Sequence, residues 1–182
     1  MRKIIVDIDN TLWDLAPVLY EHIRAVTPTV PLPAEWYQWD FWKGYISEKA
    51  VYGMLRDIHM HQDEFGVYPD AAKFLTNLRK KGFYIIIASH REKGTIKATE
   101  EWLKKHQLAF DEVHLSHDKS VLFGDCWAIV DDSPTTLDKA EKAGIVRVGL
   151  RNPWNEKKHH PLFDNLDEIY DYLQGQCAAG TP

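Results

Sequence analysis

Short apolar runs alternate with stretches of helical periodicity along most of the chain. The runs are rich in Ile and Val, as expected of strands that are buried on both faces of a sheet. They are Ile4–Val6, Phe83–Ala88, Glu112–Leu115, Trp127–Val130 and Ile145–Val148. Such alternation predicts an α/β fold, in which a Rossmann-like parallel sheet carries helices on both faces.

Apolar spacing, capping residues and glycine stops predict the helices between these strands. The expected helices are Ala16–Val26, one that Ser47 caps and that ends before Gly66, one from Pro69 to Lys81, one from Thr95 to Lys105, Pro134–Ala143 and Asn165–Leu173. The first three fall between the first two strands, which is more than a single crossover needs.

Residues 14–67 therefore break the alternation, and they are rich in aromatic side chains. Six aromatic residues stand close together: Trp36, Tyr37, Trp39, Phe41, Trp42 and Tyr45. The three-residue spacing of the tryptophans favours a helix. We expect 14–67, called the inserted segment below, to form a small helical cap on a core made of 1–13 and 68–175. A flexible tail of small and polar residues is expected over 176–182.

The composition narrows the class of protein. The chain has 182 residues, is 45% hydrophobic and 27% charged, and carries a net charge of −5, which is typical of one soluble globular domain. Because basic residues are not in excess, we expect no stable complex with nucleic acid. The longest apolar stretch is too short to span a membrane. Asp7 interrupts the apolar run that follows Met1-Arg2-Lys3, so we expect no signal peptide there. Because the sole cysteines are Cys126 and Cys177, we expect a reducing cytoplasm.

Acidic side chains appear abruptly at the ends of two predicted strands. Asp7 and Asp9 follow the first strand, and Asp131 and Asp132 follow the fourth. In a doubly wound sheet, ligands bind outside the carboxyl ends of the strands. If these strands are neighbours, their carboxylates crowd together and cannot all stay ionised without a cation, which favours a Mg²⁺ site. The alternative is that they are solvated loop ends or helix caps.

Two further polar residues follow predicted strands. Ser89 comes after the second strand, where a hydroxyl beside backbone N–H groups can hold a phosphoryl oxygen. Lys119 comes after the third strand, and beside clustered aspartates it would neutralise both a nucleophile and a phosphate. Each residue alone is also compatible with an ordinary role, a helix cap for Ser89 and a solvated surface charge for Lys119.

Taken together these residues resemble the four motifs of the haloacid dehalogenase superfamily, in order and spacing, over most of the chain. The motifs are a strand followed by Asp7-x-Asp9-x-Thr11, then Ser89, then Lys119, then Asp131-Asp132. Within the superfamily, the chain is most similar to the 5′(3′)-deoxyribonucleotidases. That similarity lies in Leu115-Ser-His-Asp-Lys119-Ser, in Gly124-Asp125, and in the short aromatic-rich insertion.

The resemblance implies a phosphatase that works through an aspartyl-phosphate. Asp7 would attack phosphorus, and Asp9 would protonate the leaving alcohol and then deprotonate water. Mg²⁺ would be held by Asp7, by the main-chain carbonyl of Asp9 and by Asp131, with Asp132 supporting them. Ser89 and Lys119 would bind the phosphoryl group. A mutase would also carry both Asp7 and Asp9.

The inserted segment is where we expect the substrate to be selected. Its clustered aromatics could stack a nucleobase, with Trp42 and Tyr45 as the expected contacts, or could merely attach the segment to the core. His90 and Arg91 directly follow Ser89, and they could reach a second anionic or polar group of the substrate or form a solvated loop pair.

The sequence thus predicts a Mg²⁺-dependent phosphomonoester hydrolase whose partner is a small phosphorylated metabolite. A nucleoside monophosphate, deoxy or not, is the leading substrate class. The alternatives are a phosphatase for another metabolite, such as a sugar phosphate or phosphoglycolate, and a catalytically silent module that binds nucleotides. An exposed aromatic edge of the inserted segment could also pair two subunits.

Overall fold

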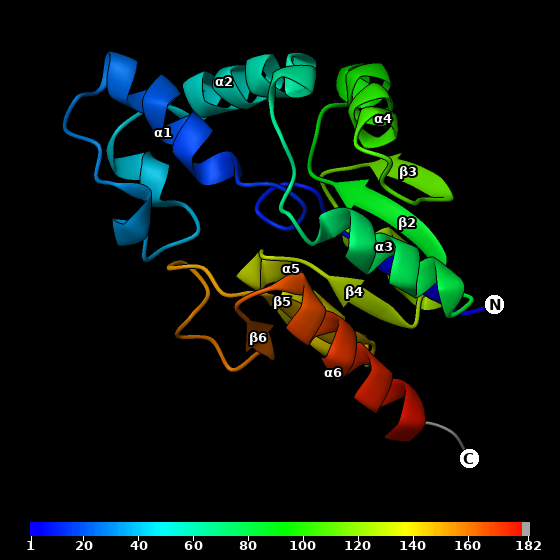
Figure 1. Cartoon of the computed structure of the whole chain (residues 1–182). Helices are drawn as coiled ribbons and strands as arrows, with labels where there is room; N and C mark the ends of the chain where they lie inside the picture. Colours follow the sequence, from blue (N-terminus) through cyan, green and yellow to red (C-terminus); the bar gives the residue numbers. More distant parts are fainter. Residues whose placement is uncertain (180–182) are drawn as a thin grey trace.

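A six-stranded parallel sheet forms the centre of the computed structural model, which describes residues 1–179 (Figure 1). The strand order is β3-β2-β1-β4-β5-β6, and every neighbouring pair is parallel. The strands are β1 Lys3–Val6, β2 Tyr84–Ser89, β3 Glu112–Leu115, β4 Ala128–Val130, β5 Val146–Leu150 and β6 Leu162–Phe163. The α/β fold with a parallel sheet is confirmed.

The first strand lies in the middle of the sheet. In β1, Ile4 is paired with Ile85 of β2 on one side and with Ala128 of β4 on the other. The expected neighbourhood of the first and fourth strands is therefore present. Because the strands are parallel, the residues that follow β1, β2 and β4 all emerge at the same edge of the sheet.

Helices cover both faces of the sheet. The α-helices are α1 Leu15–Val26, α2 Glu48–Met60, α3 Ala71–Lys80, α4 Ile96–Lys105, α5 Pro134–Lys142 and α6 Leu166–Ala179. Successive side chains of a strand point to opposite faces. Accordingly, Ile4 packs in one core cluster with Phe74 of α3 and Ile169 of α6, whereas Ile5 packs in a second cluster with Ala140 of α5.

The inserted segment contains α1, α2 and three short 3₁₀-helices, η1 Pro33–Glu35, η2 Phe41–Gly44 and η3 Gln62–Glu64. Figure 1 shows α1 and α2 on the side of the sheet toward which the strand arrows point. The Ser47 hydroxyl caps α2 by accepting a hydrogen bond from the N–H of Ala50, as expected. The helical interpretation of the tryptophan spacing is wrong, because Trp36 and Trp39 lie outside the helices and only Trp42 falls within η2.

The C-terminal region differs most from the sequence-based expectations. β6 is a two-residue strand that pairs with β5, and its brevity leaves no period-2 pattern to detect. The last helix continues to Ala179, so its expected end at Leu173 is wrong and the helix extends into the residues expected to form a tail. Cys177 packs against the main core cluster, which holds this last turn in place. Residues 180–182 lie outside the described residues.

Gly149 permits the close approach of β5 to the end of β4. A Cβ atom placed on Gly149 would lie 2.2 Å from the carbonyl oxygen of Asp131, far inside van der Waals contact. β5 can therefore lie this close to Asp131 only because the residue at position 149 has no side chain. Gly149 thereby helps to set the position of an acidic residue that the sequence singled out.

We expect Gly149→Ala to lower the free energy of unfolding by about 1–3 kcal/mol, the usual effect of overpacking a core. Urea denaturation followed by circular dichroism measures this loss. The matched control is Gly175→Ala in α6, where an added Cβ meets open space. That change should stabilise the protein by about 0.5–1 kcal/mol, because alanine favours helix. Equal effects of the two substitutions would contradict the packing argument.

Candidate active site

Three carboxylates meet at the carboxyl ends of β1 and β4. Asp7 follows β1 directly, and Asp131 and Asp132 follow β4. Each offers an oxygen that lies within 4.8 Å of the oxygens of the other two, and all three residues are buried. Asp131 is held in place because its Oδ1 accepts a hydrogen bond from the N–H of Ser133, 2.8 Å away.

Lys119 joins this carboxylate cluster from the first turn of η5 (Lys119–Asp125). Its Nζ donates to Asp7 Oδ1 and to Asp131 Oδ2, each at 2.6 Å, and the side chain is only 2% exposed. Burial alone would favour the neutral amine, but the carboxylates of Asp131 and Asp7 raise the pKa of Lys119 above its ordinary value. The lysine is therefore a fixed positive charge inside the cluster.

The cluster still holds more negative charge than Lys119 balances. Burial, together with the repulsion of Asp131 and Asp9, raises the pKa of Asp7 to about 7 despite the lysine. The pKa of Asp132 is raised well above its usual value by burial and by the nearby charges of Asp7 and Asp131. Crowded carboxylates that resist ionisation are the ligands that a hard divalent cation such as Mg²⁺ stabilises. The residues present fit such an ion.

Asp9 lines the same cavity as the carboxylate cluster but is not one of its three members, and its side chain is bound on several sides. Its Oδ1 accepts from Trp13 Nε1 at 2.9 Å, and Arg91 forms a two-bonded ion pair with both oxygens at 2.6 and 3.0 Å. Burial alone would raise the pKa of Asp9, but the Arg91 guanidinium holds it well below the usual range. Asp9 is therefore ionised.

The three residues at the end of β2 point in different directions. Ser89 Oγ donates to Asp9 Oδ2 at 3.1 Å, and Ser89 and His90 both line the cavity beside the carboxylate cluster. Arg91 does not line that cavity and is 1% exposed. The expectation that Arg91 reaches the substrate, or is solvated, is therefore wrong, because Asp9 and other buried partners hold its guanidinium.

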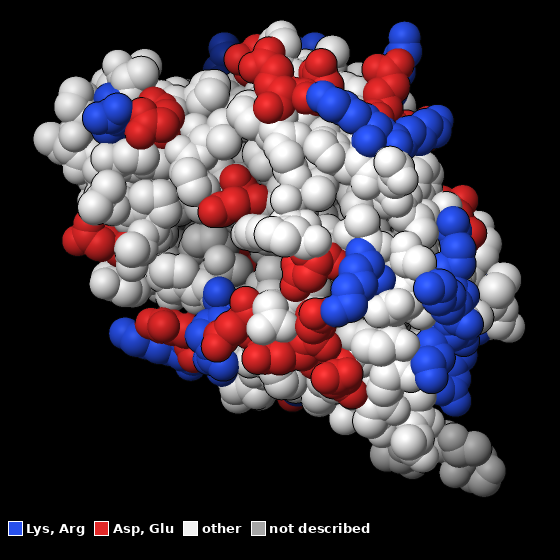
Figure 2. Space-filling view, in the orientation of Figure 1, with Lys and Arg blue, Asp and Glu red and all other residues white. Residues whose placement is uncertain are grey.

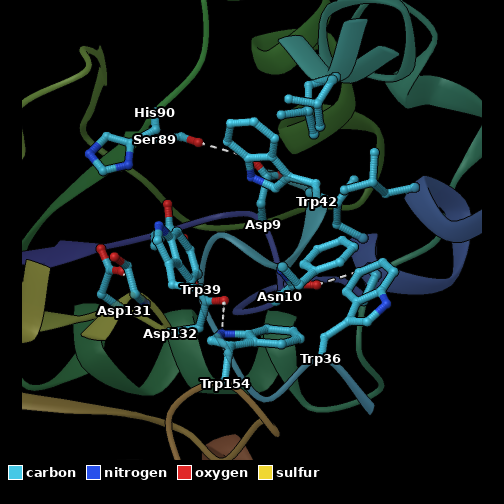
Figure 3. Close-up of a pocket in the computed structure, with 18 of the residues that line it drawn as sticks. Asp9, Asn10, Trp36, Trp39, Trp42, Ser89, His90, Asp131, Asp132 and Trp154 are labelled. Atoms are coloured by element: carbon cyan, nitrogen blue, oxygen red, sulfur yellow. Dashed lines mark hydrogen bonds between the residues drawn. The ribbon is translucent and has the colours of Figure 1, made fainter. Parts of the chain in front are cut away.

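Aromatic side chains form much of the remaining wall of this cavity (Figure 3). The rings come mainly from the inserted segment, and a further one, Trp154, follows β5; the set is Trp36, Trp39, Phe41, Trp42, Tyr52 and Trp154. The cavity thus combines acidic groups at the strand ends with flat, largely apolar surfaces.

The predicted aromatic contacts are placed differently from one another. Trp42 lines the cavity, whereas Tyr45 is 39% exposed and does not line it, so Tyr45 is not brought to the site. Trp36 is buried and stacks on Phe41, with ring centroids 3.7 Å apart. Packing and cavity lining therefore coexist, because Trp36 packs in the main core cluster and lines the cavity, which Trp39 and Trp42 also border.

Two residues near the carboxylates were not singled out as site residues by the sequence. Trp154 Nε1 donates to Asp132 Oδ2 at 3.1 Å, across 22 residues of chain. His59 of α2 is buried, and its Nε2 lies 3.3 Å from Asp9 Oδ2, although not aligned as a hydrogen bond. Neither residue carries a local sequence signal for the site, because each reaches it only through the packing of elements that are far apart in the chain.

Charged side chains are spread unevenly over the face shown in Figure 2. They gather over the top, right and lower parts of the view, while much of the surface over α1 and its neighbouring 3₁₀ segments is uncharged. Several aromatic side chains of this segment stay exposed, namely Tyr37, Trp39, Tyr45 and Tyr52. Within residues 1–179, no helix has the length and apolarity needed to cross a membrane.

Comparisons with known proteins agree with this architecture. A haloacid dehalogenase-like hydrolase from Streptococcus pneumoniae superposes with a TM-score of 0.66 and 15% identity, covering 96% of this chain and 99% of that one. A predicted phosphoglycolate phosphatase from Haemophilus somnus gives 0.64 and 18%, over 96% and 98% of the two chains. A protein of Chlorobaculum tepidum named "Putative 5′(3′)-deoxyribonucleotidase" is 22% identical over 93% of this chain and 88% of its own length.

The parallel sheet gives the chain the fold of the haloacid dehalogenase-like hydrolases, and the match to a family model makes it a phosphoric monoester hydrolase of that type. Within that class, the chain belongs to the family described as 5′ nucleotidase, deoxy (pyrimidine), cytosolic type C protein, whose family model matches residues 2–176. The resemblance stated from the motifs is confirmed.

His90 generates a pH prediction. Burial, reinforced by the positive charge of Lys119, lowers the pKa of His90 to about 4, whereas an unfolded histidine titrates near 6.5. Between these values the unfolded chain binds a proton that the folded chain does not. The contribution of His90 to stability is therefore complete above about pH 6.5 and is lost as the pH falls toward 4.

We therefore expect the wild type to lose stability relative to His90→Gln as the pH is lowered from 7 to 5. Urea denaturation of both proteins at the two pH values measures this difference. A difference in unfolding free energy that stays constant between pH 7 and pH 5 would show that His90 is not held neutral by its surroundings.

Proposed function

We propose that the protein is a Mg²⁺-dependent 5′-nucleotidase that hydrolyses nucleoside monophosphates, deoxynucleotides included, through an aspartyl-phosphate on Asp7. The observation that carries this proposal is the buried cluster of Asp7, Asp131 and Asp132 around Lys119, which faces an aromatic cavity. The acidic groups suit the metal, the ammonium of Lys119 suits the reacting phosphate, and the aromatic walls suit a nucleobase.

In the first step, an oxygen of Asp7 attacks phosphorus and forms a new P–O bond while the bond from phosphorus to the leaving oxygen breaks. Asp9 gives its proton to that leaving oxygen. Asp9 is ionised in the unliganded site, and the negative charge of an arriving phosphate monoester favours its protonated form. Lys119 and Ser89 bind the phosphoryl oxygens and stabilise charge that develops there.

In the second step, water attacks the phosphorus of the aspartyl-phosphate, and Asp9 takes a proton from that water. The bond between phosphorus and the Asp7 oxygen breaks, so that inorganic phosphate leaves and the Asp7 carboxylate is restored. Because Arg91 holds the pKa of Asp9 low, Asp9 is ionised in the unliganded site, which is the form needed to accept the proton. Asp9 thus serves as acid and base in turn.

Asp7, Asp131 and the main-chain carbonyl of Asp9 would hold the metal, with Asp132 beside them. Mg²⁺, when bound, supplies positive charge that lets carboxylate and phosphate approach one another. Asp132 Oδ2 is already bound to Trp154, which supports a role in orienting the cluster. His90 is neutral, so it offers the substrate a polar contact rather than a positive charge.

The inserted segment would act as the cap that selects the substrate. Trp39 and Trp42 border the cavity, and an aromatic face that stacks a base contributes about 1–3 kcal/mol. The Chlorobaculum tepidum relative and the family description both name deoxynucleotides or nucleotidases, which favours a nucleotide over a sugar phosphate. We place the enzyme in the cytoplasm, in line with the cytosolic family description. Pairing of two subunits through the exposed aromatics stays a prediction.

We expect the wild type to hydrolyse p-nitrophenyl phosphate only with Mg²⁺, and Asp7→Asn to lose nearly all turnover because it removes the nucleophile. Release of p-nitrophenol with and without Mg²⁺ measures both effects. Asp125→Asn, which changes an exposed aspartate in an ion pair with Lys3, is the control and should keep full activity. Nucleotide binding without any metal-dependent turnover would favour the silent binding module.

Trp42→Leu should lower kcat/KM for nucleoside monophosphates about 5- to 100-fold, because it removes one stacking face. Rates on ribose 5-phosphate and phosphoglycolate should change little, since neither carries an aromatic base to stack on the indole. Phosphate release from a panel of both substrate types measures this. Tyr45→Leu, in the same segment but outside the cavity, is the matched control. Preference of the wild type for a sugar phosphate or phosphoglycolate would favour the alternative phosphatase.

A further inference from the structure

Arg91 is the most completely buried cation beside the site, and nearly all its hydrogen-bonding capacity is used. Nε and Nη2 bind the two oxygens of Asp9. Nη1 donates to Thr99 Oγ1 of α4 at 3.1 Å, and Nη2 also donates to Gln62 Oε1 of η3 at 3.0 Å. The core and the inserted segment therefore both hold this guanidinium in one orientation.

Stability alone does not account for such a group. The free energy of removing a guanidinium and a carboxylate from water offsets much of their mutual attraction. Well-packed apolar residues of similar volume often give a protein the same stability. The planar fork of arginine does, however, fix the rotation of a carboxylate in a way that a lysine cannot. The arrangement therefore suits a carboxylate whose orientation matters.

The donors around Asp9 fall into two groups. Arg91 and Trp13 do not line the cavity, whereas Ser89 and His59 do. Both cavity-lining groups approach Oδ2, at 3.1 and 3.3 Å. When Ser89 turns its hydroxyl to a phosphoryl oxygen, Oδ2 becomes the carboxylate oxygen open to the cavity, while Arg91 and Trp13 still hold the carboxylate from behind.

We propose that Arg91 is a positioning residue, which holds Asp9 so that Oδ2 faces the leaving oxygen and, later, the attacking water. The inserted segment takes part through Gln62, which fixes Arg91. This inference rests on the proposed function, in which Asp9 exchanges protons with those two groups. Arg91 itself touches no substrate, since the cavity does not reach it.

The test is Arg91→Lys, which keeps the buried charge but loses the two-bonded fork. We expect kcat/KM, which reports the steps up to departure of the leaving group, to fall about 100-fold for a nucleoside monophosphate, the low end of what proton transfer contributes. For p-nitrophenyl phosphate, whose leaving group needs little protonation, kcat/KM should fall less than about tenfold. Arg79→Lys, at the exposed pair with Asp111, is the matched control and should leave both rates unchanged.

A double-mutant cycle shows whether Arg91 acts through Asp9. If it does, Arg91→Lys lowers kcat/KM no further when Asp9→Asn is already present. Full addition of the two losses, or equal losses of kcat/KM on both substrates, would overturn the inference. Thr99→Val removes one anchor of Arg91 and should give a smaller loss with the same leaving-group dependence, so the test stands even if Arg91→Lys folds poorly. Absence of Mg²⁺-dependent turnover in the wild type would instead overturn the proposed function, and this inference with it.

Discussion

The rest of the site depends on one electrostatic constraint, the repulsion among three buried carboxylates at the ends of two adjacent strands. Lys119 relieves part of it by bridging Asp7 and Asp131, but burial and the repulsion among the carboxylates still raise the pKa values of Asp7 and Asp132. Binding of a cation to such a buried carboxylate cluster is favourable, because it reduces the repulsion among the carboxylates. In a purely structural core, an excess of buried carboxylates would only destabilise the folded protein. The cluster is therefore better suited to a site that binds a cation and a phosphate.

The topology of the sheet creates this constraint. β1 lies between β2 and β4, so three loop beginnings meet at one edge and deliver Asp7, Ser89 and Asp131 from positions far apart in the chain. The fit between β4 and β5 is tight enough to require glycine at position 149. The packing of the sheet and the placement of the carboxylates are therefore one property of the fold.

The inserted segment contributes to the site at two levels. Its tryptophans border the cavity where an uncharged part of a substrate can lie. Its His59 and Gln62 reach the Asp9–Arg91 pair, so the segment that would select the substrate also touches the residue proposed to move protons. A displacement of α2 and η3 would change both at once, because these contacts come from neighbouring turns of chain.

The amino-acid sequence was enough to locate most of the helices and strands and to show which kinds of side chain follow them. Alternating apolar runs, the Ser47 cap and the acids after β1 and β4 are local features, and local propensity predicts them well. The tertiary structure decided which side chains meet. Arg91 follows Ser89 directly, yet it turns into the core toward Asp9, while Trp154 arrives from beyond β5 to bind Asp132. A two-residue strand such as β6 and a side chain's direction in a loop leave no periodic pattern. Contacts across tens of residues depend on how crossovers and the inserted segment pack, and that packing is set by the whole fold rather than by any neighbouring stretch of chain.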